Sequence, residues 1–195
     1  MSKSLLEKIE FVFQYIYEVN EEPIFHPGIS EQKVLKLFQK LGLTPLREII
    51  QIYTIHNGVD LLNGFFSMNS IERVAWIYEF YGDVRKDHEE INRLRQEEPG
   101  FRGDEFMWSE NLFPLFDYNG DVKICIDLDT SELFSFELEG NARWKLAEHY
   151  ETYLDAIIYM IENSYFHFYG TEGTLGVREE FWKITLNKFQ IDSAW

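Results

Sequence analysis

Asp117, Asn119 and Asp121 place oxygen-bearing side chains at alternate positions, as at the start of an EF-hand calcium loop. Such a loop also needs glycine at its sixth position and glutamate at its twelfth, where this chain has Val122 and Leu128. The Asn-Gly step in this segment is instead a strong signal for a tight β-turn, because both residues tolerate a positive φ. The segment therefore predicts a β-hairpin and no metal site.

The other residues with catalytic potential are isolated from one another. His56 precedes a second Asn-Gly step at the expected end of a helix, where an imidazole can complement the helix dipole without any chemistry. Cys125 alternates with acidic residues, which raise a thiol pKa, so we interpret it as a packing residue. The remaining histidines lack metal-binding spacing, and one cysteine cannot build a structural zinc site. They are His26, His88, His149 and His167. We predict no catalytic residue, no metal and no cofactor.

Carboxylates gather in one part of the chain. Between Asp117 and Glu139 the sequence has seven acidic residues and one lysine. We predict that this acidic segment binds a partner. Its candidate contact residues are Asp117, Asp121, Asp127, Asp129, Glu132 and Glu137. The alternative is that the acids only keep an aromatic-rich protein soluble.

The whole chain is also acidic, with a formal net charge of −16 from 34 acidic and 18 basic residues. Nucleic acids are bound by clustered lysine and arginine, so this composition argues against a direct nucleic-acid ligand and favours a partner with a basic surface. No apolar run reaches membrane-spanning length. The single cysteine and the absence of a signal-peptide pattern fit a soluble cytoplasmic protein. The oligomeric state stays open.

With 195 residues, of which 45% are hydrophobic, the chain can bury one core. We expect a single α+β domain with an antiparallel sheet of four to six strands and helices packed on one side. Residues 1–163 form the main domain. Residues 164–195 form a C-terminal extension packed on it, whose pattern is ambiguous between helix and strand.

The expected sheet contains a short strand at 64–68, the hairpin strands at 112–116 and 122–128, and a third strand at 133–138. Apolar and polar residues alternate in the 122–128 strand, so one of its faces requires a core. A helix follows, with an apolar stripe from Tyr150 to Ile161. The residues expected to be buried together between sheet and helix are Ile124, Ile126, Phe136, Leu154 and Ile158.

Capping residues mark the other helices. Helical spacing covers residues 3–19, and Ser30 and Gly42 bound a second helix. A third helix starts at Thr44-Pro45 and ends at His56. Asn69 or Ser70 caps a fourth, which becomes highly charged from residue 83 and passes into a loop that reaches residue 105.

Three of these pieces, in this order, resemble the SUKH superfamily, the cell-wall-regulator-like domain of many bacterial toxin-immunity proteins. They are Pro27-Gly28-Ile29-Ser30 at a helix start, Thr44-Pro45-Leu46 to Asn57-Gly58 around the next helix, and the Leu112 to Leu128 hairpin. The passage from Trp144 into the Tyr150 helix is similar to the end of that domain. The resemblance covers roughly residues 27–163, while the 83–105 segment is longer than usual and the tail has no counterpart.

The resemblance implies an antiparallel sheet backed by helices and a function performed by binding, with no catalytic residues to carry over. We therefore expect a bacterial immunity protein that binds and neutralises a cognate toxin domain. Its basic partner fits a nuclease, because nucleases must bind phosphate. The alternative is a non-catalytic regulatory scaffold of the cell-wall-regulator type.

Overall fold

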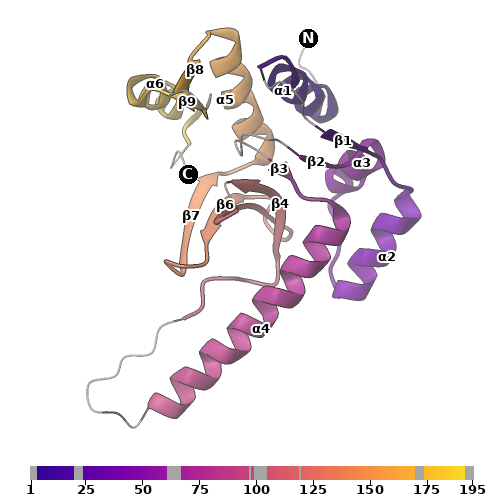
Figure 1. Cartoon of the computed structure of the whole chain (residues 1–195), viewed down its shortest axis with the longest axis vertical. Coiled ribbons are helices and arrows are strands. Elements are labelled where there is room, and N and C mark those ends of the chain that lie inside the picture. The colour runs from indigo at the N-terminus through magenta and orange to yellow at the C-terminus, as the bar shows by residue number, and fades with distance from the viewer. Residues whose placement is uncertain are drawn as a thin grey trace.

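A curled antiparallel sheet forms the centre of the computed structural model (Figure 1). The structure describes residues 4–19, 24–60, 67–96, 98, 105–118, 120–169 and 174–191. The strands of the main sheet follow one another in chain order, and every neighbouring pair is antiparallel. They are β1 (Ile24–Pro27), β2 (His56–Asp60), β3 (Ser67–Met68), β4 (Leu112–Tyr118), β5 (Val122–Asp127), β6 (Leu133–Glu137) and β7 (Ala142–Ala147). The predicted α+β class is confirmed, with seven strands where four to six were expected.

Helices surround this sheet. They are α1 (Leu5–Val19), α2 (Glu31–Leu41), α3 (Arg47–Ile55), α4 (Ile71–Arg95), α5 (Tyr150–Glu162) and α6 (Glu179–Phe189). In Figure 1, α1 and α5 lie at one end of the molecule, and α4 projects from the other end. Within the described residues, no helix has both the length and the apolar character that crossing a bilayer requires.

The predicted capping residues are largely confirmed. The Ser30 hydroxyl accepts a hydrogen bond from the Lys33 backbone N–H, and Ser70 caps α4 in the same way through Arg73. Gly42 ends α2 with a φ of 72°, a left-handed conformation that glycine adopts without strain. The third helix begins at Arg47, after Leu46, so its predicted start at Thr44-Pro45 is early by two residues.

Position 28 requires glycine for a structural reason. A Cβ atom there would lie 2.0 Å from the Thr54 carbonyl oxygen. The Ile29 backbone N–H also donates to the Tyr53 carbonyl at 2.9 Å. Only glycine allows the chain before α2 to pass this close to the end of α3.

The two faces of β5 belong to two hydrophobic clusters. Ile124 and Ile126 lie in the larger cluster, with side chains from α1, α3 and α5. Cys125 lies in the smaller one, with Ile77 and Tyr81 of α4. The helices α1, α3 and α5 therefore cover one face as predicted, and α4 additionally covers part of the other.

The expectation that Phe136 shares a core with Ile124 is wrong. Phe136 pairs with Lys123, whereas Ile124 pairs with Ser135, so Phe136 points to the opposite face. There its ring packs on Tyr81 and Trp108, at centroid distances of 5.2 Å for each pair. The other four residues of the predicted group, Ile124, Ile126, Leu154 and Ile158, are buried together in the larger cluster.

The C-terminal part, whose sequence pattern was ambiguous between helix and strand, contains both. β8 (Phe166–Tyr169) and β9 (Thr174–Val177) form an antiparallel pair, and α6 follows. Phe166, Trp182 and Ile191 join the larger core cluster, so residues 164–191 pack on the main domain where they are described. Two other predictions lie partly outside the described residues. They are the strand at 64–68, of which residues 64–66 are not described, and the loop that reaches residue 105, of which residues 97 and 99–104 are not described.

We expect the substitution Ile126→Ala to lower the free energy of unfolding by about 2 to 5 kcal/mol, because it removes the core contacts of a side chain that is 3% exposed. The control is Ile184→Ala on α6, whose side chain is 47% exposed and whose loss should change stability by less than about 0.5 kcal/mol. Urea unfolding measures both. Equal effects of the two substitutions would contradict the burial of Ile126.

Candidate partner-binding site

The structure separates the predicted contact residues into two groups at opposite ends of β5. Asp121 and Glu137 lie at the β4–β5 end, where Glu137 pairs with Val122. Asp129 and Glu132 lie in the connection between β5 and β6. Six residues of extended strand separate the ends by about 20 Å. The carboxylates that are close in sequence therefore do not form one surface.

Two of the predicted contact residues are buried. Asp117 is 9% exposed, and one of its carboxylate oxygens lies 2.8 Å from Lys123 Nζ. Asp127 is 8% exposed and accepts hydrogen bonds from the backbone N–H groups of Asp129 and Thr130. These carboxylates hold a cross-strand pair and a turn and expose little surface, so their contact with a partner stays a prediction that the other four acids carry.

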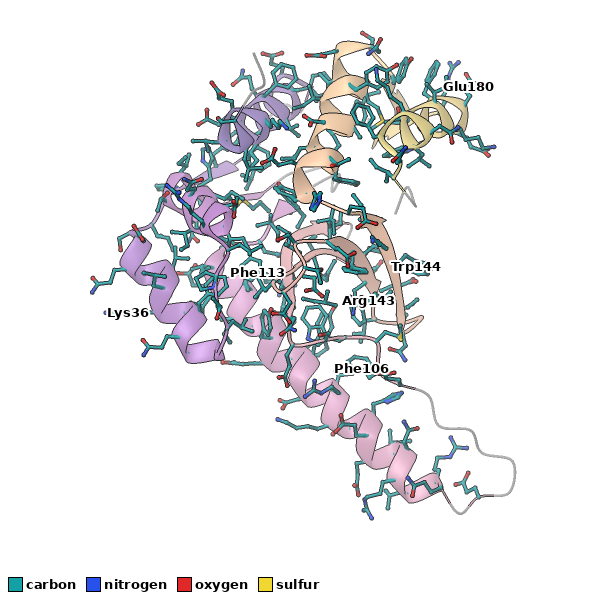
Figure 2. All side chains as sticks on the ribbon, turned by 180° about the vertical axis from the view of Figure 1, so that it is seen from behind. Lys36, Phe106, Phe113, Arg143, Trp144 and Glu180 are labelled. Atoms are coloured by element: carbon teal, nitrogen blue, oxygen red, sulfur yellow. The ribbon has the colours of Figure 1, made fainter. Side chains whose placement is uncertain are left out.

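A second ion pair lies on the same face of the sheet as the Asp117–Lys123 pair. Arg143 on β7 lies 3.6 Å from an Asp127 oxygen and places its guanidinium 3.8 Å from the centre of the Phe134 ring. Arg143 and Trp144 point to opposite sides of β7, as expected for adjacent strand residues (Figure 2). The charges inside the sheet are thus neutralised within the chain.

Asp129 and Glu132 remain near the surface, in the connection whose Ser131 lines a pocket. Asp129 is exposed and accepts a hydrogen bond from the Asn111 side-chain amide. Glu132 accepts a hydrogen bond from Lys145 at 2.6 Å, which lowers the pKa of its carboxyl group. Lys145 also binds Glu148 at 2.6 Å. Between them in the chain, Ser131 lines the pocket.

We call this pocket the turn pocket; it has a volume of about 420 Å³, within the range that holds small ligands or side chains. Its walls come from α1, α3, α5 and the β5–β6 connection. They are formed by Leu5, Leu46, Glu48, Ile49, Ile126, Ser131, His149, Tyr150, Glu151, Thr152 and Asp155. Apolar side chains and three carboxylates line it together, so it suits a group that is both cationic and partly apolar.

Lys8 of α1 fixes one side of the turn pocket. Its side chain is 5% exposed, and its Nζ atom lies 2.8 Å from Asp155 and 3.3 Å from Glu151. Burial tends to lower the pKa of Lys8, but hydrogen bonds and attraction to the two α5 carboxylates outweigh it and raise that pKa above the ordinary value. The pair joins α1 to α5 across the core.

Ser131 and His149 both line the turn pocket, and a serine beside a histidine invites comparison with a hydrolytic site. A triad requires a hydrogen bond from nucleophile to base and a carboxylate that orients the base. In the described chain the side chains of Ser131 and His149 share no hydrogen bond, and no carboxylate binds the imidazole. The described residues therefore do not assemble a serine–histidine–carboxylate triad at this pocket.

Cys125 and His56 are packing residues in this structure. Cys125 is fully buried, and burial raises the pKa of its thiol well above the usual range despite nearby Lys123 and Arg143. The His56 ring contacts Phe13 and Phe25, and burial lowers its pKa although Glu10 opposes this. Burial thus favours the neutral imidazole, which weakens the predicted complement to the helix dipole.

The pocket residues Lys8, Glu48, Glu151 and Asp155 were not predicted from the sequence. They come from α1, α3 and α5, and no local pattern links positions so far apart. Among the described residues, no group of three or more histidine, cysteine, aspartate or glutamate side chains is arranged to hold a metal ion.

Comparison of the chain with models of known protein families gave no match, and comparison with curated proteins gave none either. The resemblance to the SUKH superfamily therefore stays a prediction from its motifs. The turn pocket and its charges are the observations on which a function can be argued.

We expect Lys123→Met to lower the free energy of unfolding by about 3 to 5 kcal/mol, because it leaves the buried Asp117 carboxylate without its cation. The double substitution Asp117→Asn with Lys123→Met removes both charges and should recover most of this loss. Urea unfolding of the two variants tests the pair. A double variant as unstable as the single one would show that packing, not charge, makes Lys123 important.

We expect Lys8→Met to cost roughly 1 to 3 kcal/mol of stability at pH 7, where the amine is charged and bound to two carboxylates. Since folding raises the pKa of Lys8, its contribution is complete below the unfolded lysine pKa of about 10.4 and is lost as pH rises through the folded-state value. The difference in unfolding free energy between the wild type and Lys8→Met should therefore shrink above about pH 10.4.

Lys40→Met is the matched control, because Lys40 makes an exposed pair with Glu79 at 3.0 Å and such pairs contribute little. A pH-independent difference for Lys8→Met would mean that only its aliphatic stem stabilises the fold.

Proposed function

We propose that this protein is a non-catalytic immunity protein that binds and neutralises a cognate toxin domain, with a nuclease as the toxin class that its charge favours. The observation that carries the proposal is the turn pocket, which combines an apolar base with carboxylates on a chain of net charge −16. An inhibitor of this kind occupies a basic cleft and keeps the substrate out.

Charge around the turn pocket supports this choice of partner. Glu48, Glu151 and Asp155 line it, and the exposed Asp129 stands two residues before the lining Ser131 in the chain. Lys8 binds two of these carboxylates, and Lys145, which follows in β7, is bound to Glu132 and Glu148. The region thus keeps an excess of negative charge that attracts a phosphate-binding surface by the same force that attracts phosphate.

The shape of the pocket supports recognition of a side chain. Its base consists of Leu5, Leu46, Ile49 and Ile126. An arginine or lysine places an aliphatic stem before its charge, so it can contact such a base while its cationic group meets the carboxylates at the edge. We propose that a basic side chain of the toxin enters here.

The fold is compatible with the resemblance that suggested immunity. The helix pair α2–α3, the β4–β5 hairpin and α5 occur in the order of the SUKH motifs, and the antiparallel sheet is backed by helices. This agreement supports the proposal at the level of architecture alone. The regulatory scaffold remains the competing proposal.

A genetic experiment separates the two. The reading frame directly upstream is expressed in a host cell with and without this protein. Growth arrest by the neighbour, relieved by this protein, supports immunity. A harmless neighbour, or a toxin that this protein neither binds nor blocks, would contradict the proposal and favour the scaffold.

Reversing charge at the pocket should slow association with that toxin. We expect Glu48→Lys with Asp129→Lys to lower the association rate about tenfold at low salt and to flatten its salt dependence, because exposed charges act mainly by steering. Stopped-flow fluorescence across a salt series measures both quantities.

The matched control reverses two exposed carboxylates elsewhere, Glu89 on α4 and Glu180 on α6, with the same change of net charge. Circular dichroism verifies that both double variants fold. Equal slowing by the two pairs of substitutions would mean that the pocket charges contribute only to solubility and net charge.

A further inference from the structure

The outward side of α4 carries large apolar residues that the fold does not cover. Trp76 is 47% exposed, Phe80 38%, Ile91 52% and Leu94 63%. We call these four residues the α4 stripe. At 3.6 residues per turn, Trp76 and Leu94 lie about five turns apart and Phe80 and Ile91 about three, so the four share one side of the helix.

The opposite side of α4 is the one that serves the fold. Ile71, Val74, Ile77 and Tyr81 are buried there. Further along, His88 contacts Phe106, with ring centroids 5.6 Å apart, so the returning chain also lies on the inner side. The α4 helix therefore has two apolar sides, of which the described structure uses one.

The first half of the stripe has the features of a binding hot spot. The Trp76 and Phe80 rings stack at 5.1 Å with an interplanar angle of 8°. The Arg73 guanidinium lies 4.2 Å from the Trp76 ring centre. Stacked aromatic and arginine side chains at a surface are the groups that contribute most to protein association.

We propose that the α4 stripe is a self-association surface, on which α4 of a second copy of this chain lies antiparallel. The stripe is self-complementary about a two-fold axis that passes between the two helices at the level of residue 85. That axis places Trp76 opposite the Leu94 of the second copy and Phe80 opposite its Ile91, which matches each large ring with an aliphatic side chain. An isologous interface requires this property.

Charges beside the stripe complement one another in the same register. Glu79, which binds Lys40, comes level with Arg93, which binds Glu90. Because the second half of α4 projects from the body, it can extend along the first half of the other copy's helix (Figure 1).

The register also predicts the strength of the dimer. The stripe is about 27 Å long, so a helix pair buries less area than a standard stable interface. Near the axis, Asp83 and Asp87 approach the same residues of the second copy, and Lys86, which binds Asp83 at 3.0 Å, offsets only part of the repulsion. We therefore expect a micromolar dimer that strengthens as salt rises.

Analytical ultracentrifugation of the wild-type chain over roughly two decades of micromolar concentration tests the dimer itself. Ile91→Glu with Leu94→Glu should weaken association at least about tenfold, and Asp87→Asn should tighten it. The control, Ile184→Glu, places one such charge on another exposed apolar position and should leave association unchanged. A monomer at all concentrations, or a dimer unchanged by the stripe variants, would overturn the proposal.

Disulfide trapping tests the register. A chain with both Trp76→Cys and Leu94→Cys should form a covalent dimer on oxidation, because the axis brings these positions together. Leu94→Cys alone should not, because antiparallel helices keep its two copies far apart. The native Cys125 is fully buried and gives no background. Cross-linking through Leu94→Cys alone at the same rate would exclude the antiparallel arrangement.

Discussion

The structure depends on a strand that is buried on both faces. In β5, Ile124 and Ile126 face one hydrophobic cluster, and Cys125 faces the other. A strand with strict alternation needs a core on each side when both sets of side chains leave water. The two cores account for the rest of the architecture: α1, α3 and α5 cover one face, while α4 and the segment around Phe106 and Trp108 cover the other.

This double burial also decides what the carboxylates do. A charge inside the sheet must be paired, since an isolated buried carboxylate is strongly destabilising. Asp117 therefore meets Lys123, and Asp127 meets backbone N–H groups and Arg143. Among the described acids of this segment, Asp121 and Asp129, just outside the ends of β5, are exposed to solvent. The turn pocket forms at one such end, where α5 and α3 bring further carboxylates to it.

Two surfaces of different chemistry result. The turn pocket combines carboxylates with an apolar base and suits a cationic side chain. The α4 stripe is apolar and aromatic and suits a flat helical surface. They lie on different elements, so one chain can associate with a second copy while the pocket stays open to another protein. Self-association and neutralisation are therefore independent proposals, each with its own variants.

The sequence by itself determined the local elements of this protein. Ser30, Ser70 and Gly42 act within a few residues, through hydrogen bonds to the nearest backbone groups or through the conformation of a single residue, so their positions could be predicted. The hairpin, the α5 stripe and the α+β class followed from patterns of similar range.

Only the tertiary structure decided which residues share a face or a site. Phe136 fell on the far side of the sheet because strand register paired it with Lys123. Lys8 became a buried partner of Asp155 because α1 packs on α5, and acids adjacent in sequence separated because β5 places its two ends about 20 Å apart. Register and packing are set by contacts between distant segments, which no local pattern contains.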